Sequence, residues 1–274
     1  MFLSNLQIFN NTLTMKMIAF NKFQGAGNDF IIIDNRGEIF NPADHELIRK
    51  MCDRRFGIGA DGLILINKAM GEYDFEMVYF NSDGYEGTMC GNGGRCAVEF
   101  ARRNNIAGPR VIFRAVDGIH HATAEEGSVN LKMSDIKDVS MIREKYFINT
   151  GSPHYLIFHN DIDNLDVYSE GKKIRYSSDF APGGTNVNFI QPAGDGIYVR
   201  TYERGVEDET LSCGTGVTAS AIAAVLTGQF VSSPVNVKTR GGNLSVKFNA
   251  EGEKITDVWL WGPATFVFEG TIEI

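Results

Sequence analysis

Long hydrophobic runs are missing from this 274-residue sequence. Its longest apolar stretches, such as residues 62–66, have the length of a β-strand, whereas a membrane-spanning helix needs about 20 apolar residues. Residues 1–16 contain several Asn and lack the basic start and apolar centre of a secretion signal. We therefore expect a cytoplasmic protein without a membrane-spanning segment, in which residues 1–16 are an extension with no assigned function.

Clustered positive charge is also missing. The 26 Lys and Arg residues are outnumbered by 34 Asp and Glu residues, which gives a net charge of −8, and they are scattered along the chain. An acidic protein without basic runs is a poor partner for nucleic acid. Because 43% of the residues are hydrophobic, the chain can form one or two globular cores. We expect a small-molecule substrate and no nucleic-acid partner.

Motifs for metals and cofactors are scarce. The four cysteines are few for a disulfide framework and lack the paired Cys-x-x-Cys spacing of a zinc site. The five histidines are dispersed except for His120 and His121, whose side chains would point in opposite directions on a strand. The sequence contains no phosphate-binding loop and no lysine in a pyridoxal-phosphate context. We predict neither a metal nor a cofactor.

One apparent nucleotide-binding motif is excluded by its context. Residues 57–62 read Gly-Ile-Gly-Ala-Asp-Gly and match the dinucleotide fingerprint Gly-x-Gly-x-x-Gly. That fingerprint needs a strand before it and a helix after it. Here a predicted helix at 41–54 comes before it and a predicted strand at 63–66 comes after it. We therefore predict a helix-to-strand turn.

Short apolar runs bounded by Gly, Asn and Asp dominate the sequence, and they predict strands. They lie at residues 18–23, 29–34, 63–66, 75–80, 111–115, 129–133, 155–158, 197–202, 235–239 and 244–248. Helical patterns are fewer, at residues 41–54, 94–104 and 216–227. A regular βαβ alternation would need a helix between most strands, so the pattern predicts an α+β fold.

An internal repeat divides the chain. Cys90-Gly-Asn-Gly-Gly and Cys213-Gly-Thr-Gly-Val each follow a polar loop and open a predicted helix. A weaker repeat pairs Gly27-Asn-Asp-Phe with residues 185–189, Thr-Asn-Val-Asn-Phe. Two repeats in the same order favour a duplicated unit over chance similarity. We predict two similar domains, 17–134 and 135–262, in a pseudo-twofold arrangement that places the two cysteines face to face.

Cys90 and Cys213 each occupy the first turn of a predicted helix. The unpaired N–H groups and the positive end of the helix dipole favour a thiolate there. The glycines that follow would leave backbone amides open to an anion such as a carboxylate: Gly91, Gly93, Gly214 and Gly216. A thiolate and a thiol on opposite sides of a carbon can remove a proton from one face and add one to the other, which inverts that carbon without a cofactor.

The obstacle to such an inversion is the weak acidity of a proton beside a carboxylate, which a thiol with a pKa of about 8.5 does not remove in water. Amides from two helix starts would stabilise the carbanion, most strongly in a closed, dry site. We therefore expect the domains to close over the substrate. Cys52 and Cys96 lack this setting, and we expect them to be buried as small hydrophobic side chains.

Several motifs occur together in the order found in one enzyme family: Gly25-Ala-Gly-Asn-Asp-Phe30, Phe80-Asn-Ser-Asp-Gly84, Cys90-Gly-Asn-Gly-Gly-Arg-Cys96, Glu203-Arg-Gly205 and Cys213-Gly-Thr-Gly216. From about residue 17 to the C-terminus, the sequence resembles the diaminopimelate epimerases. The resemblance implies two pseudo-symmetric domains, each a mostly antiparallel or mixed sheet wrapped around a central helix, with the active site between them and a last strand, 263–274, that completes the first domain. It also implies an isomerase that interconverts LL-2,6-diaminopimelate and meso-diaminopimelate for lysine and peptidoglycan precursors.

The resemblance implies roles for residues around the catalytic pair, Cys90 and Cys213. The distal amino-acid end of the substrate would be held by Asn28, Asn81, Asn186, Glu203 and Arg204, in which Glu suits an ammonium and Arg a carboxylate. N–H donors to the reacting carboxylate would come from Gly91, Asn92, Gly214 and Thr215. His154 either contacts the substrate or a thiol, or is a structural histidine.

Three departures from the family pattern weaken the expectation about specificity rather than about reaction type. Ser152 stands where many members have Asn, Gly62 stands where some have Gln, and the segment 205–210 is one residue longer. Two other functions stay open: a different two-cysteine racemase, such as a proline racemase relative, and a non-enzymatic thiol sensor that forms a disulfide between Cys90 and Cys213. The resemblance also implies a homodimer, although no sequence feature requires one.

Overall fold

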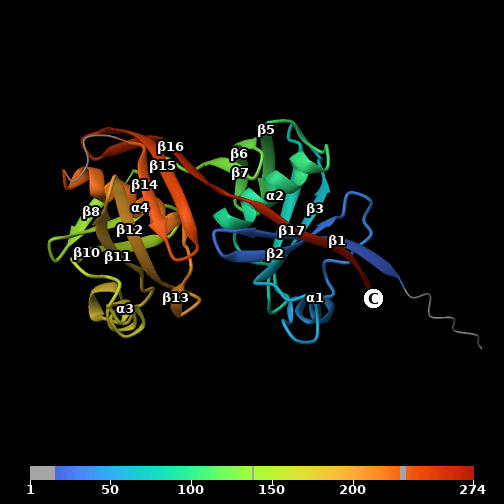
Figure 1. Ribbon diagram of the computed structural model, residues 1–274, viewed down its shortest axis with the longest axis horizontal. Coiled ribbons are helices and arrows are strands. Elements are labelled where there is room, and N and C mark those ends of the chain that lie inside the picture. Colours follow the sequence, from blue (N-terminus) through green and yellow to red (C-terminus); the bar gives the residue numbers. More distant parts are fainter. Residues whose placement is uncertain (1–15, 138, 229–232) are drawn as a thin grey trace, which may run out of the picture.

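The computed structural model describes residues 16–137, 139–228 and 233–274, and it shows two lobes side by side (Figure 1). The N-terminal lobe contains β1 (Met17–Gly25), β2 (Asn28–Asp34), α1 (His45–Cys52), β3 (Gly62–Lys68), β4 (Phe75–Asn81), α2 (Gly91–Arg103), β5 (Arg110–Ala115), β6 (Gly118–Glu125), β7 (Ser128–Lys132) and β17 (Thr265–Glu273). The C-terminal lobe contains β8 (Val139–Ile142), β9 (Lys145–Asn149), β10 (Pro153–Phe158), α3 (Val167–Arg175), the short 3-10 helix η1 (Ser178–Phe180), β11 (Asn186–Ala193), β12 (Gly196–Glu203), β13 (Asp208–Thr210), α4 (Gly214–Leu226), β14 (Val235–Thr239), β15 (Gly242–Glu251) and β16 (Lys254–Pro263).

The strands pair mostly in antiparallel fashion, and their hydrogen bonding continues from one lobe to the other. Within the described residues, hydrogen bonds join 17 strands into one mixed sheet, whose parallel pairs are β2–β3, β4–β5, β10–β11 and β12–β14. β16 links the lobes because it pairs with β15 and with β7. The chain then returns to the N-terminal lobe, where β17 pairs with β1 from Met17 opposite Glu273. This architecture confirms the predicted α+β class.

Each long helix is buried against the strands of its own lobe. α2 packs in a hydrophobic cluster with residues such as Phe30 and Phe113, and α4 packs in a separate cluster with residues such as Leu156 and Val246. α4 is built from Gly, Ala, Ser, Thr, Val, Ile and Leu and is buried along most of its length, as expected for a helix without a polar face. The sheet therefore holds the start of each long helix in a fixed place.

The helix predicted at 41–54 is shorter in the structure, because α1 begins at His45 and ends at Cys52. Its N-cap is Asp44, whose carboxylate accepts a hydrogen bond from Leu47 N at 3.0 Å. Asn41 and Pro42 instead begin a turn in which Asp44 N donates to Asn41 O at 3.2 Å, so the predicted start was too early. Residues 57–61 then lead directly into β3, which confirms the predicted helix-to-strand turn.

The other helices show where packing overrides local sequence preference. α2 and α4 begin at Gly91 and Gly214, earlier than predicted, because the sheet stabilises glycine-rich first turns that have low helix propensity. α3 was not predicted. Gly171 interrupts its pattern, yet a Cβ there would lie 2.3 Å from the Tyr202 Cβ, so the glycine allows α3 to pack closely on β12.

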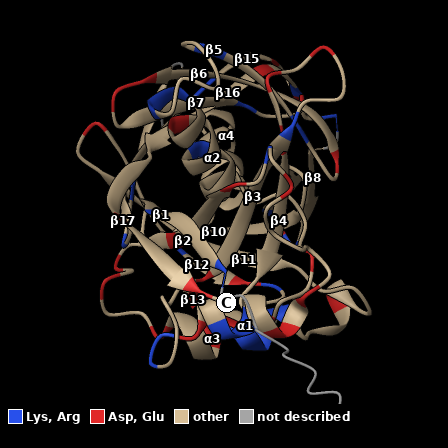
Figure 2. Ribbon diagram, turned by 90° about the vertical axis from the view of Figure 1, so that its right-hand side faces the viewer, with Lys and Arg blue, Asp and Glu red and all other residues tan. Residues whose placement is uncertain are grey.

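Lys, Arg, Asp and Glu residues are interspersed over the ribbon rather than segregated by sign (Figure 2). Along the described part of the chain, we find no helix with the length and apolar character needed to cross a membrane. Residues 1–15 of the predicted N-terminal extension lie outside the described residues.

Candidate active site

The two predicted catalytic cysteines stand immediately before the two long helices. Cys90 is the N-cap of α2 and Cys213 is the N-cap of α4, both in extended backbone. Their carbonyl groups accept the first helical hydrogen bonds, from Gly94 N at 2.7 Å and Val217 N at 2.8 Å. The repeated sequence therefore corresponds to the same local backbone in both lobes.

These two helix starts meet between the lobes. α2 and α4 contact each other, and both lie in the interior of the view in Figure 2. Asn92, next to the first cysteine, donates from Nδ2 to the carbonyl of Ser212, next to the second, at 3.2 Å. Negative charge on Cys90 contributes to the raised pKa of Cys213, so the thiols lie within electrostatic reach of each other. Both cysteines belong to one site.

Burial dominates the acidity of both thiols, because it raises the pKa of Cys90 and of Cys213 above the ordinary value. The helix-start amides act in the opposite direction, as the sequence predicts: N–H groups of Gly93 and Asn92 lower the pKa of Cys90, and that of Gly216 lowers the pKa of Cys213. Desolvation outweighs the amides. The thiolate expected from the helix starts alone is therefore not the favoured form of either group in the empty site.

The glycines of the two motifs differ in purpose. A Cβ at Gly91 would have open space around it, which suits close approach of a ligand to the backbone. A Cβ at Gly93 would instead lie 3.3 Å from Ile64, and one at Gly216 would lie 2.4 Å from the Asn188 Nδ2. All four glycines were expected to leave backbone amides open to an anion. Gly93 and Gly216 instead allow close packing of the helices, because they face the interior of their lobes.

Polar side chains around Cys90 form a network that reaches across the N-terminal lobe. Asn28 accepts a hydrogen bond from Asn92 Nδ2 and donates from its own Nδ2 to Asp61 at 3.0 Å. Asn92 accepts from Arg95 Nη2 at 2.7 Å. Two predicted site residues, Asn28 and Asn92, are therefore brought together. Asn81 lies exposed at the end of β4.

Polar side chains around Cys213 form a second network centred on His154, which is fully buried. Its Nδ1 lies 2.8 Å from Asn188 Oδ1, and its Nε2 lies 3.0 Å from Ser152 Oγ and 3.0 Å from Thr215 Oγ1. Thr215 Oγ1 is 3.4 Å from the Cys213 sulfur. Burial lowers the pKa of His154 to about 4, so the ring is neutral at pH 7. A hydroxyl therefore links this neutral imidazole to the thiol.

Glu203 and Arg204 lie at the end of β12 and have different surroundings. The Glu203 carboxylate accepts from Thr210 Oγ1 at 2.8 Å. Burial raises the pKa of that carboxyl, and hydrogen bonds from Thr210 and Cys213 oppose the shift. Arg204 is exposed, and its backbone N–H donates to Asn186 Oδ1 at 2.8 Å. Glu203, the last residue of β12, thus reaches the thiol, whereas Arg204 follows the strand in a turn.

Arg95 lies inside the first cysteine motif, Cys90 to Cys96, but its position there did not predict a role. Arg95 is completely buried, and among the described residues it forms no ion pair with a carboxylate. Its guanidinium donates to Asn92 Oδ1 and, at 3.4 Å, to the carbonyl groups of Gly91 and Pro263. The available signal was a charged residue on the apolar face of the helix. Cys52 and Cys96 are buried, as predicted.

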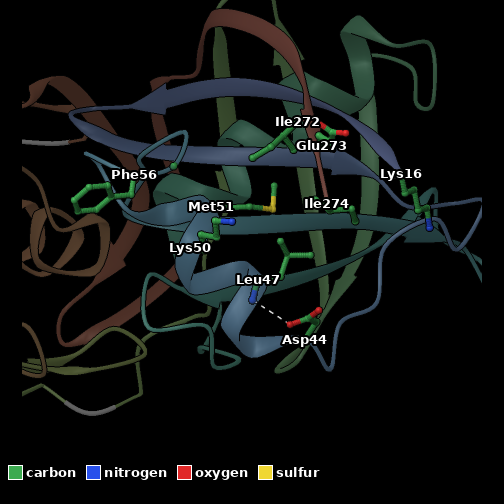
Figure 3. Close-up of a pocket in the computed structure, with 10 residues that line it drawn as sticks. Lys16, Asp44, Leu47, Lys50, Met51, Phe56, Ile272, Glu273 and Ile274 are labelled. Carbon is green, nitrogen blue, oxygen red and sulfur yellow. Dashed lines mark hydrogen bonds between the residues drawn. The ribbon is translucent and has the colours of Figure 1, made fainter. Parts of the chain in front are cut away.

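Two surface cavities lie away from the cysteines. One, of about 370 Å³, lies between α1 and the C-terminal residues Ile272, Glu273 and Ile274 (Figure 3). The other, of about 420 Å³, is lined by residues 135–137 and 253–256. Neither includes a predicted site residue. Over the residues whose positions are described, no group of His, Cys, Asp and Glu is arranged to hold a metal ion.

Known proteins match this chain over nearly its whole length. The model of the family described as diaminopimelate epimerase matches residues 20–137 and 146–267. The diaminopimelate epimerase of Flavobacterium psychrophilum is 52% identical over 253 residues, which cover 92% of this chain and 98% of that protein. The diaminopimelate epimerase of Chlorobaculum tepidum is 48% identical over 261 residues, which cover 91% of this chain and 99% of that protein.

The fold recurs in solved structures of much lower sequence identity. A phenazine biosynthesis protein of the PhzF family from Bacillus anthracis superposes with a TM-score of 0.73 at 16% identity, covering 95% of this chain and 100% of that chain. At this identity, the likeness concerns the fold alone.

Proposed function

This chain belongs to the diaminopimelate epimerase family, and we propose that Cys90 and Cys213 carry out its reaction. The chain is an isomerase that interconverts LL-2,6-diaminopimelate and meso-diaminopimelate, a step toward lysine and peptidoglycan precursors. The observation that supports the assignment of the sulfurs is that one cysteine caps each of two contacting helices, one from each lobe.

The reaction needs two proton transfers on opposite faces of one carbon. The thiolate of one cysteine takes the α-proton, and the electron pair of the C–H bond moves into the carboxylate. The thiol of the other cysteine gives its proton to the opposite face, so the two sulfurs exchange protonation states and the reverse reaction exchanges their roles. A thiolate in a largely dry site is a stronger base than one in water, which narrows the difference in acidity between thiol and α-proton.

We assign stabilisation of the carbanion to backbone N–H groups at the two helix starts. Gly91, Asn92, Gly214 and Thr215 follow the cysteines in the first helical turns. N–H groups at these positions have no partner within the helix, and they point toward an anion placed at its start. Negative charge that builds on the reacting carboxylate would meet donors from both lobes, most effectively after water is excluded.

We assign Glu203 to the ammonium group at the reacting carbon, because its carboxylate is hydrogen-bonded to Cys213. This refines the expectation from the sequence, which placed Glu203 at the distal end. Arg204 is exposed in the turn after β12 and suits a distal carboxylate. Asn28, Asn81 and Asn186 complete the proposed distal site.

We also propose the division into domains 17–134, completed by 263–274, and 135–262, together with a cytoplasmic homodimer. β17 pairs with β1 alone among the described strands, and it exposes Val267 and Phe268. An apolar edge of this kind favours burial against a second copy. Light scattering during gel filtration would give twice the chain mass of 30.3 kDa for a dimer.

The activity is tested by incubating the protein with LL-diaminopimelate in deuterated water and following the α-carbon by NMR. Deuterium should enter at the α-position while the meso isomer accumulates, because the incoming proton comes from a thiol that exchanges with solvent. Proline and hydroxyproline serve as comparison substrates and should not react. A protein that exchanges neither diaminopimelate nor these amino acids would support the sensor reading instead.

A further inference from the structure

Tyr79 lies beside Cys90 but has no part in the proton transfers assigned above. It occupies β4 on the same face as Phe75 and Met77, which are buried in the cluster that packs on α2. Its ring meets Phe30 edge-on, with centroids 6.0 Å apart. Burial raises the pKa of Tyr79, and negative charge on Cys90 raises it further, so the phenol stays protonated next to the thiol.

Two glycines make room for this ring. A Cβ at Gly62 would lie 2.5 Å from Tyr79 Cε2 and 2.9 Å from its hydroxyl oxygen, and a Cβ at Gly87 would lie 2.9 Å from Cδ1 and from Cε1. A Cβ at Gly62 would also lie 2.4 Å from the Phe80 carbonyl oxygen. Neither glycine has a positive φ, so the close approach rather than backbone conformation excludes a larger residue. The Tyr79 phenol therefore fills the space in which a side chain at position 62 would project.

The hydroxyl of Tyr79 has no structural hydrogen bond. Among residues 16–137, 139–228 and 233–274, no hydrogen bond to this hydroxyl contributes to its raised pKa. Within the same ranges, the completely enclosed side-chain atoms that lack a partner are Ser212 Oγ and Ser220 Oγ, so the Tyr79 hydroxyl is not completely enclosed. A phenylalanine would fill the same apolar space. The hydroxyl is therefore available to donate to a ligand beside position 62.

The neighbour of Tyr79 on this face of β4 is Asn81, two residues farther along the strand. The two side chains lie together, because a Cβ at Gly87 would meet the Tyr79 ring at 2.9 Å and Asn81 Nδ2 at 3.0 Å. Asn81 belongs to the proposed distal site. The reacting carboxylate is taken by the helix-start amides, so the group left for a neutral phenolic donor beside Asn81 is the distal carboxylate.

We propose that the Tyr79 hydroxyl is a specificity-determining group that donates a hydrogen bond to the distal carboxylate of diaminopimelate, and that it replaces the polar side chain missing at Gly62. This inference rests on the proposed function. The hydroxyl supplies a polar group beside position 62, where the chain has Gly instead of the Gln of some family members.

Binding measured by calorimetry tests the contact without relying on turnover. The Tyr79→Phe variant should bind LL-diaminopimelate and 2-aminopimelate about tenfold or more weakly, the size of a hydrogen bond to a charged group. Lysine, which lacks the distal carboxylate, should bind both proteins equally. The matched control is Tyr155→Phe, which removes a hydroxyl bonded to Ile142 O at 3.3 Å in the C-terminal lobe and should leave all three affinities unchanged.

Kinetics provide the second readout. In Tyr79→Phe, KM for LL-diaminopimelate should rise about tenfold while kcat stays within about twofold, because the phenol takes no part in the proton transfers. Unchanged affinity for 2-aminopimelate, or equal losses for 2-aminopimelate and lysine, would overturn the assignment of the hydroxyl. An inactive wild-type protein would overturn the proposed function instead, and the two failures are therefore distinguishable.

Discussion

The start of α2 and the start of α4 share a backbone frame but differ in charge. Each begins with a cysteine N-cap followed by glycine. In both helices, the side chain of the fifth residue after the cysteine donates a hydrogen bond to the carbonyl of that glycine. Arg95 Nη1 donates to Gly91 O at 3.4 Å, and Thr218 Oγ1 donates to Gly214 O at 2.9 Å. The first turns of α2 thus contain a buried guanidinium, whereas the equivalent position of α4 has a neutral hydroxyl.

The surroundings of Cys213 differ further through Glu203 and His154. Negative charge on Glu203 raises the pKa of both thiols and, for Cys213, is the largest cause after burial, whereas positive charge on Arg95 lowers the pKa of Cys90. His154 is neutral and reaches Cys213 only through Thr215. The comparison teaches that a duplicated fold supplies two equivalent positions for sulfur, while side chains outside the repeat make the two thiols unequal.

The most severe test removes each sulfur in turn. Cys90→Ala and Cys213→Ala should each lower epimerisation by about 10²–10⁴-fold, because each half-reaction needs one proton donor and one acceptor. NMR of meso-diaminopimelate formation measures the rate, and circular dichroism checks the fold. Cys52→Ala, which alters a buried sulfur outside the site, should keep normal activity. Normal turnover in either of the first two variants would contradict a two-thiol mechanism.

The neutral histidine of the C-terminal lobe makes stability depend on pH. Its pKa is lowered from 6.5 to about 4, so below pH 6.5 the unfolded chain binds a proton that the folded protein does not. Wild-type protein should therefore lose about 3 kcal/mol of unfolding free energy from this group as pH falls from 6.5 to 4.

Urea unfolding of His154→Gln at several pH values measures that loss. The unfolding free energy of the variant should fall less than that of wild type as pH is lowered from 6.5 to 4. In the N-terminal lobe, Asn92→Ser removes no titrating group and should shift stability equally at every pH. Parallel wild-type and His154→Gln curves would show that the ring is not held neutral.

The positive charge of Arg95 should control how readily the Cys90 thiol reacts. Arg95→Met should slow alkylation of Cys90 by iodoacetamide about tenfold at pH 7.5, the effect of raising its pKa by about one unit. Peptide mass spectrometry resolves the two cysteines. The matched change Thr218→Val should leave Cys213 within about twofold of its normal rate. Equal effects in the two lobes would remove the proposed inequality.

The smallest effect concerns Glu203, whose negative charge raises the pKa of Cys213. Glu203→Gln should speed alkylation of Cys213 about threefold, since half a unit of pKa has that effect on the thiolate fraction. Glu209→Gln is the control, because that carboxylate pairs with Arg200 and Arg240. Slower alkylation of Cys213 in Glu203→Gln would mean that the carboxylate assists ionisation.

Much of the fold followed from local patterns, but the boundaries did not. Alternating and continuous apolar runs predicted strands such as β2, β4 and β12, whose residues pack directly on the long helices. Because the first turns of α2 and α4 are rich in glycine, both helices were predicted to begin later than they do. Because Gly171 interrupts the helical pattern, α3 was not predicted. These glycines allow close packing between distant elements, which a local pattern does not contain.

The sequence by itself determined the family and its reaction class, and it predicted the two catalytic sulfurs, because a repeated cysteine at a glycine-rich helix start is a local feature. Tertiary structure alone decided what surrounds each sulfur. Arg95, Glu203, His154 and Tyr79 reach the site from α2, β12, β10 and β4, elements that only folding brings together. Acidity and substrate contacts depend on burial and on distances of a few ångströms, and these follow from packing rather than from position along the chain.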